Sequence, residues 1–263
     1  MQAFTYTRAT TVPEAVTAAA GDDVRLLAGG QSLLAAMKLG LVAPAALVDL
    51  GALPELKGIT SGAEGLTIGA MTPHEAVAES PEVRAALPAL ADLAGRIGDR
   101  QVRQRGTIGG SLANADPAAD WPAAVLGLGA TIRTDRRTIA SDDFFLGLYE
   151  TALEAGEIIT AVTFPVPTRA AWQKFAQPAS RFSLVGVFVS ASPAGVRVAV
   201  TGAGPCVFRV PALEGKLAAS WSEAACATVA VSARGLNGDL HGSAEYRAAL
   251  IPVLAGRAVA ACA

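Results

Sequence analysis

Two glycine-rich stretches are the parts of this sequence best suited to hold a phosphorylated ligand. In the first, from Leu26 to Leu33, an apolar run ends in Gly29-Gly30 and passes into Gln31-Ser32, where a helix is expected to begin. Glycine tolerates positive φ and lets a ligand approach the backbone closely, and unpaired N–H groups at a helix start suit a phosphate or pyrophosphate. Taken alone, the Gly-Gly pair is explained equally well as a tight turn.

The second stretch, from Arg105 to Asn114, combines glycines with the small hydroxyl side chains of Thr107 and Ser111. These hydroxyls can donate to phosphate or ribose oxygens. Asp116 and Asp120 follow closely, and a carboxylate beside a dinucleotide can accept hydrogen bonds from ribose hydroxyls. The alternative for each aspartate is a helix cap or a solvated turn residue.

Motifs of several other chemistries are absent from the sequence. Neither stretch is GxGxxG, and no GxxxxGK[ST] occurs, which argues against a Rossmann or a P-loop protein. His74-Glu75 begins like a zinc-protease motif, but Ala78 stands where the second histidine must be. With His74 and His241 as the only histidines, a histidine-rich metal site is excluded, and no G-x-S-x-G nucleophile elbow is present.

The composition predicts a soluble, cytoplasmic protein with a sizeable core. The chain has 263 residues, is 52% hydrophobic and carries a formal net charge of -2, which does not favour nucleic acid as a partner. No apolar run is long enough to span a bilayer, and the N-terminus lacks the basic and apolar segments of a secretory signal. Cys206, Cys226 and Cys262 form no CxxC pair and are too few for a [2Fe-2S] cluster, which needs four ligands.

The elements that must position these stretches indicate an α+β chain in three parts. Residues 1–55 are predicted to form a compact βαβ unit, with strands at 4–6, 24–28 and 46–50 and helices at 11–20, capped by Thr11, and 32–39. In residues 56–167 we expect strands at 65–70, 130–133 and 158–164 and two helices, one capped by Thr72 and one at 81–95. A glycine-broken turn is expected at 106–111, and an aromatic cluster at 144–147 is expected on a helix or turn. Pro165 and Pro167 mark the boundary to residues 168–263, where three antiparallel strands at 172–175, 183–190 and 196–201 precede helices near 222–233 and 244–260.

Taken together, the two stretches resemble the FAD-binding segments of the medium subunits of the carbon monoxide dehydrogenase and xanthine dehydrogenase family, the molybdenum hydroxylases. The segments that carry the resemblance are Ala28 to Ser32 and Thr107 to Gly110. Further matches follow in order along essentially the whole chain: Met37 to Leu39, Asp99 to Gly106, Asp116 to Asp120, Asp142 to Phe145, Gly156 to Ile158, Lys174-Phe175, Leu184 to Gly186, Thr201 to Pro205 and Ala244 to Arg247. One glycine turn is a weak signal, whereas this many ordered matches is a specific one.

The resemblance implies a fold of the p-cresol methylhydroxylase or vanillyl-alcohol oxidase type. Two α/β FAD-binding subdomains, 1–55 and 56–167, would precede a C-terminal α/β domain, 168–263, with a three-stranded antiparallel sheet. FAD would bind noncovalently, with its pyrophosphate at residues 26–33 and its isoalloxazine near Ile159 and Lys174. By position, the cofactor-binding residues would be Leu26, Leu27, Ala28, Gly29, Gly30, Gln31, Ser32, Leu33, Ile97, Thr107, Ile108, Gly109, Gly110, Ser111, Asn114, Asp120, Ile159 and Lys174.

The same resemblance implies an electron-transfer subunit that works only with partners. In the family, [2Fe-2S] clusters on an iron–sulfur small subunit deliver electrons to FAD, and a molybdopterin large subunit oxidises the substrate. This chain would then carry no catalytic or metal-ligating residue and would join a dimer of heterotrimers, a heterohexamer. The substrate could be CO, an aldehyde, a purine or another N-heterocycle, and the acceptor NAD, oxygen, a quinone or a cytochrome.

Some positions depart from the family pattern, and two rival functions remain open. Asn114 and Gln104 stand where histidine and asparagine are common, and Gln177-Pro178 replace residues that are often basic, which bears on the surroundings of the flavin ring. Lys174 is either a cation that favours reduced, anionic flavin or a surface lysine at a strand end. The rivals are a self-sufficient FAD oxidase of the same fold and a flavin-free assembly or storage protein.

Overall fold

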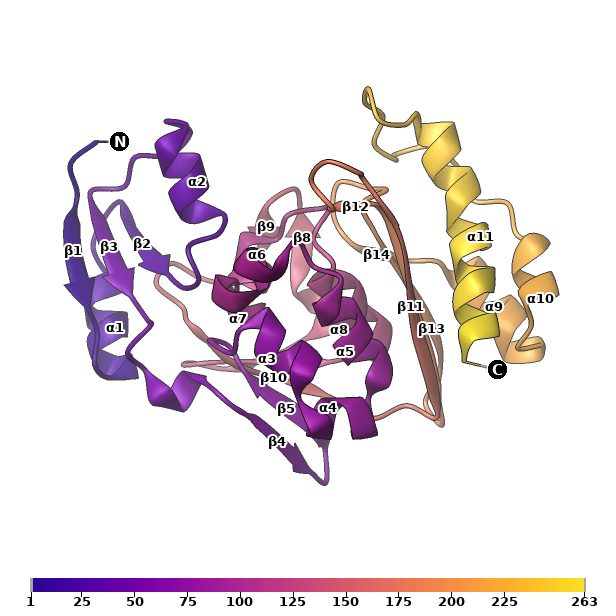
Figure 1. Cartoon of the computed structure of the whole chain (residues 1–263), viewed down its shortest axis with the longest axis horizontal. Coiled ribbons are helices and arrows are strands. Elements are labelled where there is room, and N and C mark those ends of the chain that lie inside the picture. The colour runs from indigo at the N-terminus through magenta and orange to yellow at the C-terminus, as the bar shows by residue number, and fades with distance from the viewer. Residues whose placement is uncertain (1, 263) are drawn as a thin grey trace.

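Three sheets of three to five strands follow one another along the chain. The structure, a computed structural model, describes residues 2–262. Figure 1 shows the sheets in a row, from the N-terminal unit at one end to the C-terminal helices at the other. Their strand orders are β1-β3-β2, β4-β5-β10-β6-β7 and β11-β12-β13-β14. The predicted α+β class is confirmed, and the predicted boundaries after residues 55 and 167 stay a prediction.

The first sheet forms where short strands alternate with short helices. Its elements are β1 (Thr5–Arg8), α1 (Val12–Ala19), β2 (Val24–Leu27), α2 (Leu33–Lys38) and β3 (Ala46–Asp49). Helix α1 begins where the sequence predicts, because the Thr11 hydroxyl accepts a hydrogen bond from the backbone N–H of Glu14. Both outer strands pair in parallel with β3, and β2 leads directly into Gly29-Gly30.

The middle unit packs helices against an antiparallel sheet. Its strands are β4 (Ile59–Gly62), β5 (Gly65–Gly69), β6 (Thr131–Thr134), β7 (Thr138–Ala140) and β10 (Ile159–Phe164), beside a hairpin of β8 (Phe145–Gly147) and β9 (Glu150–Thr151). Its helices are η1 (Pro54–Leu56), α3 (His74–Glu79), α4 (Pro81–Ala86), α5 (Pro88–Gly95), α6 (Arg100–Arg105), α7 (Ile108–Asn114), α8 (Trp121–Leu128) and η2 (Ser141–Asp143). Fully buried side chains such as Leu90, Trp121 and Phe164 fill the core between them.

Two helix predictions for the middle unit are wrong. Thr72 does not cap a helix, because its hydroxyl exchanges hydrogen bonds with the backbone of Gly58. The single helix expected over 81–95 is two helices, because Pro88 opens a new one and Leu87 before it leaves the helical conformation.

Two further segments of the middle unit differ from expectation. The glycine-rich segment at 106–111 is the start of helix α7 rather than a turn alone, because the Thr107 hydroxyl accepts a hydrogen bond from the backbone N–H of Gly110. The aromatic cluster at 144–147, expected on a helix or turn, lies mostly on strand β8. Helix α6 was not predicted from the residue pattern, since only Asp99 at its N-cap is a recognisable start signal.

The C-terminal unit holds a four-stranded antiparallel sheet, one strand more than predicted. Its elements are β11 (Arg169–Ala176), β12 (Ser183–Ser192), β13 (Gly195–Thr201), β14 (Phe208–Arg209), α9 (Pro211–Ala219), α10 (Glu223–Ala227) and α11 (Ala244–Ala261). The additional strand β14 is only two residues long, too short to show a periodic pattern. Helix α9 was also not predicted, and the helix expected near 222–233 is the shorter α10.

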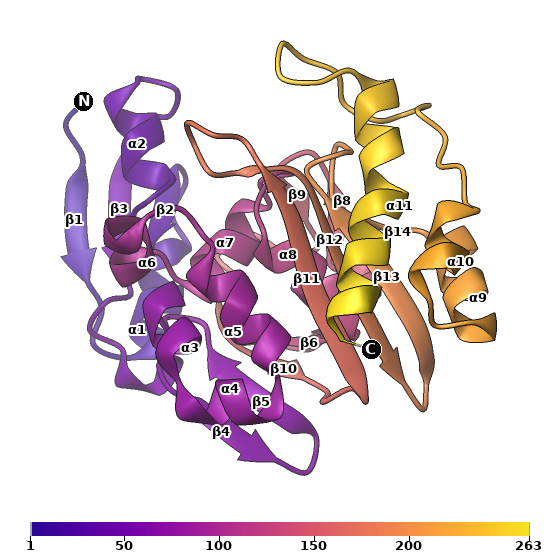
Figure 2. The same ribbon diagram turned by 45° about the vertical axis from the view of Figure 1, so that its right-hand side comes forward.

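Both faces of this sheet are covered. Val187 and Val189 of β12 pack under α11, whereas Phe188 between them faces α8 of the middle unit; Figure 2 shows α11 lying across the strands. The buried Arg247 of α11 donates to the carbonyl oxygens of Leu184 and Gly202 at 2.7 and 2.9 Å, which ties the helix to the sheet. Within residues 2–262, no helix combines the length and the apolar character needed to cross a membrane.

Candidate functional site

The structure brings the two glycine-rich stretches into backbone contact. A β-carbon added to Gly29 would overlap the carbonyl oxygen of Arg105 and would lie 2.8 Å from the Cα of Gly106. One added to Gly110 would lie 3.1 Å from the Cβ of Ala28. Residues from the first and the middle unit thus meet at one place, as expected if both stretches bind the same ligand.

The first stretch carries a run of unpaired backbone donors. The N–H groups of residues 29 to 33 make no hydrogen bond to any residue among those described, and Gly30 has a φ of +76°. Residues 26 to 30 are half-buried, and Gln31 and Ser32 are exposed. Several N–H groups that converge beside a helix start form an anion-binding concavity. This part of the chain can therefore accept a negatively charged ligand without breaking any bond of its own.

In the second stretch, by contrast, the backbone donors of the first helical turn are occupied. The N–H of Ile108 is 3.3 Å from the carbonyl oxygen of Thr72, the N–H of Gly109 is 2.8 Å from that of Ala70, and Gly110 donates to Thr107. These bonds fix the start of α7 firmly.

Between Thr107 and Asn114, the polar side chains left over are those of Ser111 and Asn114. Both residues are half-buried, and neither side chain hydrogen-bonds to another of the residues 2–262. They are therefore the side chains of helix α7 that can reach a ligand, and the Thr107 hydroxyl serves first as a helix cap.

Asp120 and Lys174 form a buried ion pair that joins α8 to β11. Lys174 Nζ lies 2.6 Å from Asp120 Oδ2, and both side chains are 3% exposed. Ser183 Oγ donates to the other oxygen of Asp120 at 2.7 Å, and Lys174 also donates to the carbonyl oxygen of Arg96. Burial raises the pKa of the Asp120 carboxyl, and Lys174 and Ser183 oppose that rise.

This geometry changes how both residues are interpreted. The view of Asp120 as a solvated turn residue is wrong, and so is the view of Lys174 as a surface lysine at a strand end. Each oxygen of Asp120 already has a protein donor, so ribose hydroxyls would have to compete with Lys174 and Ser183. The structure gives this pair a positioning role between the middle and C-terminal units, and a direct contact with the cofactor stays a prediction.

Of the predicted contacts Ile97 and Ile159, Ile97 is the more accessible. Ile97 is half-buried at the edge of the middle core, and its carbonyl oxygen accepts from Arg103. Ile159 lies in β10 and is 6% exposed, so it contributes mainly to the core. Strand β10 is linked to the second stretch through Ala70. The N–H of Ala70 donates to the carbonyl oxygen of Thr160, the residue after Ile159, and its carbonyl oxygen accepts from the N–H of Gly109.

A third polar contact, His74 with Trp121, was missed by the sequence analysis. Trp121 Nε1 donates to His74 Nδ1 at 3.0 Å, and the His74 backbone N–H donates to the carbonyl oxygen of Gly106. Burial, with a smaller contribution from Arg103, lowers the pKa of His74 to about 3, so the imidazole is neutral. The signal in the sequence was the His74-Glu75 pair at a helix start, which was considered only as a zinc motif. No group of three or more His, Cys, Asp or Glu side chains that could hold a metal occurs in residues 2–262.

The chain matches known proteins along most of its length. Residues 2–167 match a family model described as the FAD binding domain in molybdopterin dehydrogenase. The chain is 38% identical to the nicotine 6-hydroxylase medium subunit of Paenarthrobacter nicotinovorans, over 90% of this chain and 89% of that one. It is 36% identical to the carbon monoxide dehydrogenase medium chain of Hydrogenophaga pseudoflava, over 97% and 96%. Its fold matches quinoline 2-oxidoreductase from Pseudomonas putida 86 with a TM-score of 0.91 and 32% identity, over 99% of this chain and 97% of that one.

The buried ion pair leads to a prediction about stability. Asp120→Ala should lower the free energy of unfolding of the cofactor-free chain by about 3–5 kcal/mol, because it leaves the Lys174 ammonium buried without its counter-charge. The double variant Asp120→Leu with Lys174→Met should lose less free energy of unfolding than Asp120→Ala, because it buries no charge. Urea unfolding followed by circular dichroism measures both values.

The matched control is Asp92→Ala, which breaks the exposed pair of Asp92 with Arg96. The side chains of Asp92 and Arg96 are 53% and 37% exposed, so we expect the free energy of unfolding to change by less than about 1 kcal/mol. If Asp120→Ala left the stability unchanged but weakened cofactor binding, Asp120 would be a ligand contact rather than a positioning residue.

Proposed function

The chain belongs to the family of FAD-binding domains of molybdopterin dehydrogenases, and from this premise we propose that it holds FAD noncovalently between its first and middle units. The subunit type, the FAD cofactor and the oxidoreductase role expected from the sequence are confirmed by the family and by its medium-subunit relatives. The details of the site, the partners and the location in the cell are our proposal.

The run of unpaired N–H groups at residues 29 to 33 carries the proposal for the site. FAD contains a pyrophosphate, and backbone donors beside a helix start are suited to that charge. Gly30 in its left-handed conformation turns the chain there, and Gly29 removes the side chain that would keep the two units apart. The donors and the shape of residues 26–33 therefore fit the cofactor.

The remaining residues would surround FAD from the middle unit. Thr107 to Gly110 form a rigid wall against the first stretch, and Ser111 and Asn114 offer polar side chains to ribose or phosphate oxygens. Ile97 offers an apolar edge. Lys174 is neutralised by Asp120, so we propose that it orders the junction near the flavin ring and adds little net charge there.

The role of the chain is to relay electrons. Bound FAD supplies the redox centre, which takes electrons from [2Fe-2S] clusters on an iron–sulfur partner and passes them to an external acceptor. The three cysteines of the sequence cannot supply the four ligands of such a cluster, so the donor must be another polypeptide. We propose an iron–sulfur small subunit and a molybdopterin large subunit as partners, a dimer of heterotrimers, and a place in the cytoplasm.

The self-sufficient oxidase and the flavin-free assembly protein are not favoured. The relatives are named as medium subunits or chains of larger enzymes, and the matched family is one of FAD-binding domains. Those relatives are named for nicotine and for carbon monoxide. We propose that the substrate of the present complex is likewise selected outside this chain.

We predict that the flavin is released intact when the FAD-loaded protein is precipitated with acid. The His74 ring is only 5% exposed and is packed between Trp121 and the backbone of Gly106, which leaves no room for a flavin bond, and Cys206, Cys226 and Cys262 all lie in the C-terminal unit. Flavin absorbance is measured in the supernatant and in the redissolved pellet. Flavin that stays with the denatured pellet contradicts noncovalent binding.

We predict that Gly30→Val abolishes FAD binding while the chain still folds. A branched side chain at a φ of +76° is strained, and the β-carbon would lie 2.9 Å from Leu34, so the donors of residues 29 to 33 must move. The matched control is Gly40→Val, since Gly40 has a φ of +74° but open space around its β-carbon position. Gly110→Val should also abolish binding, because its β-carbon would lie 2.9 Å from the Thr107 hydroxyl.

Flavin fluorescence titration measures the affinity of each variant, and circular dichroism checks the fold. Full flavin occupancy in both Gly30→Val and Gly110→Val would show that the pyrophosphate binds elsewhere. Loss of binding in Gly40→Val as well would mean that backbone strain alone, and not the site, explains the effect.

We predict that the isolated chain oxidises no alcohol, aldehyde or heterocycle, although dithionite bleaches its flavin. In a complex co-expressed with the iron–sulfur and molybdenum subunits, the enzyme's substrate should bleach the flavin too, because electrons then have a route to it. Absorbance is recorded under anaerobic conditions. Steady turnover by the lone, metal-free chain would favour the self-sufficient oxidase.

A further inference from the structure

The His74-Glu75 pair is the one sequence motif that the proposed function does not use. Both side chains are buried, with 5% and 6% exposure, at the start of α3. Polar side chains are seldom buried unless they bond to something. Their partners lie on three other segments of the middle unit.

His74 holds the segment in front of helix α7. Its backbone N–H donates to the carbonyl oxygen of Gly106 at 2.9 Å, and its ring packs so tightly that a β-carbon on Gly106 would lie 2.7 Å from Nε2. On its other side, Nδ1 accepts from Trp121 at 3.0 Å, which fixes the ring orientation. The neighbouring residues Pro73 and Thr107 form an isolated antiparallel β-bridge beside this contact.

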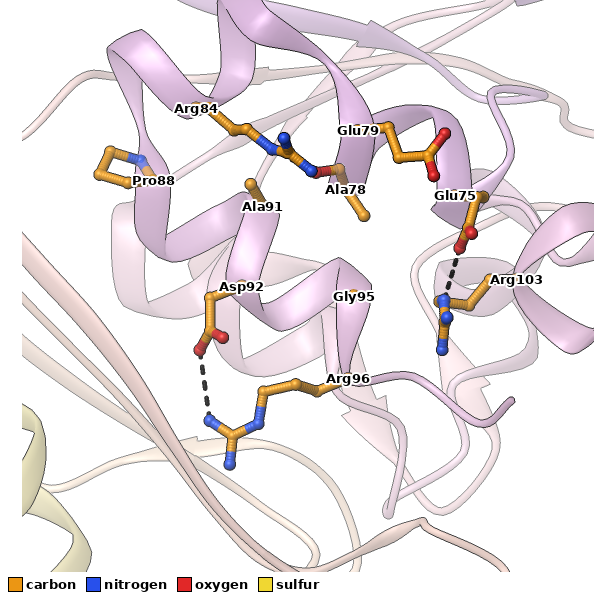
Figure 3. Close-up of a pocket in the computed structure, with 10 residues that line it drawn as sticks. All are labelled: Glu75, Ala78, Glu79, Arg84, Pro88, Ala91, Asp92, Gly95, Arg96 and Arg103. Atoms are coloured by element: carbon orange, nitrogen blue, oxygen red, sulfur yellow. Dashed lines mark hydrogen bonds and ion pairs between the residues drawn. The ribbon is translucent and has the colours of Figure 1, made fainter. Parts of the chain in front are cut away.

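Glu75 holds helix α6. Its carboxylate pairs with Arg103 Nε at 2.5 Å and with Arg100 Nε at 3.4 Å. Arg103 in turn donates to the carbonyl oxygen of Ile97 at 3.2 Å. Figure 3 shows Arg103 and Glu75 reaching toward each other across one end of a hollow of about 460 Å³, with Glu79 one turn further along the same helix.

These contacts hold the part of the chain that leads into the second cofactor stretch. Glu75 acts through Arg103 on Ile97, and His74 acts on Gly106 directly before Thr107. The Arg105–Gly106 segment is also the surface on which Gly29 rests, so its position sets that of the first stretch. Two adjacent residues thus fix the backbone at Ile97 and at Gly106, the two ends of the segment that leads into Thr107.

We propose that His74 and Glu75 are positioning residues that clamp residues 97–110 in the conformation that binds FAD. The inference rests on the proposed function, because it concerns the same site. The contacts point to positioning, because the His74 ring accepts from Trp121 of α8 while it packs against Gly106, and the Glu75 carboxylate pairs with Arg103 of α6. Neither residue touches FAD in this proposal.

The first test compares His74→Leu with His74→Asn. Leucine fills the space but offers no acceptor to Trp121, whereas the amide oxygen of asparagine can take the place of Nδ1. In flavin fluorescence titrations we expect His74→Leu to weaken FAD binding by about tenfold or more and His74→Asn to stay within about threefold of the unchanged chain. The indole N–H resonance of Trp121 reports whether the hydrogen bond is kept.

Leu90→Ala separates positioning from stability. Leu90 is fully buried in the same core, so its truncation should lower the thermal midpoint of the FAD-free chain at least as much as His74→Leu does. Its affinity for FAD should nevertheless stay within about threefold of the unchanged chain. If Leu90→Ala loses as much affinity as His74→Leu, the clamp is only core packing and the inference is overturned.

The second test compares Glu75→Gln with Glu79→Gln. Glu79 is exposed on the same helix and makes no hydrogen bond or ion pair to the residues that the structure describes, so it is the matched control. We expect Glu75→Gln to weaken FAD binding by about threefold to tenfold and Glu79→Gln to leave it unchanged. This pair carries the test if His74→Leu does not fold.

The outcomes also separate this inference from the proposed function. If Gly30→Val loses FAD but His74→Leu and Glu75→Gln bind it like the unchanged chain, the site stands and the clamp is wrong. If the unchanged chain itself does not bind FAD, the proposed function fails and the clamp with it. Loss of affinity in His74→Leu and Glu75→Gln, rescue by His74→Asn and normal binding in Leu90→Ala and Glu79→Gln support the clamp.

Discussion

The backbone contact of Gly29 with the Arg105–Gly106 segment is the constraint on which the rest of the site depends. A β-carbon at Gly29 would overlap the Arg105 carbonyl oxygen, so only glycine lets the first unit come this close to the middle unit. The contact holds the unpaired N–H groups of residues 29 to 33 beside the start of helix α7. Gly29 therefore serves the packing of the two units against each other.

Buried polar pairs then determine where the wall of the site stands. His74 bonds to Trp121, Glu75 to Arg103, and Asp120 to Lys174 and Ser183. A buried polar group that loses its partner costs about 1–3 kcal/mol, so each pair strongly disfavours any arrangement that separates it. Trp121 directly follows Asp120 at the start of α8, and the two side chains tie that helix to α3 on one side and to the C-terminal sheet on the other.

This division of tasks suits a chain that binds a cofactor and leaves the choice of substrate to others. Relatives named for nicotine, carbon monoxide and caffeine are 38%, 36% and 31% identical to it. The features described above are accordingly concentrated around the two glycine-rich stretches and the junctions between units.

Sequence alone determined the local starts and the kind of cofactor site. Thr11 before a proline and an acid defines the start of α1, and the ordered matches around Gly29-Gly30 and Thr107 to Gly110 identify the family. Such signals are local, because a helix cap or a glycine turn involves residues only a few positions apart. The clearest local error, the helix expected over 81–95, arose because the apolar pattern continues through a proline that opens a second helix.

Tertiary structure alone decided which side chains meet. From the sequence, Asp120 was expected to contact a ribose or to lie in a helix cap or solvated turn, and Lys174 to lie near the flavin ring or at the surface. Only the structure shows that the two bind each other across 54 positions of the chain. His74 and Trp121 meet across 47 positions, and no periodicity in the sequence pairs them. Similarly, β14 exists only because β13 offers it an edge. Contacts between residues so far apart depend on how the whole chain packs, and the type and spacing of neighbouring residues hold no information about them.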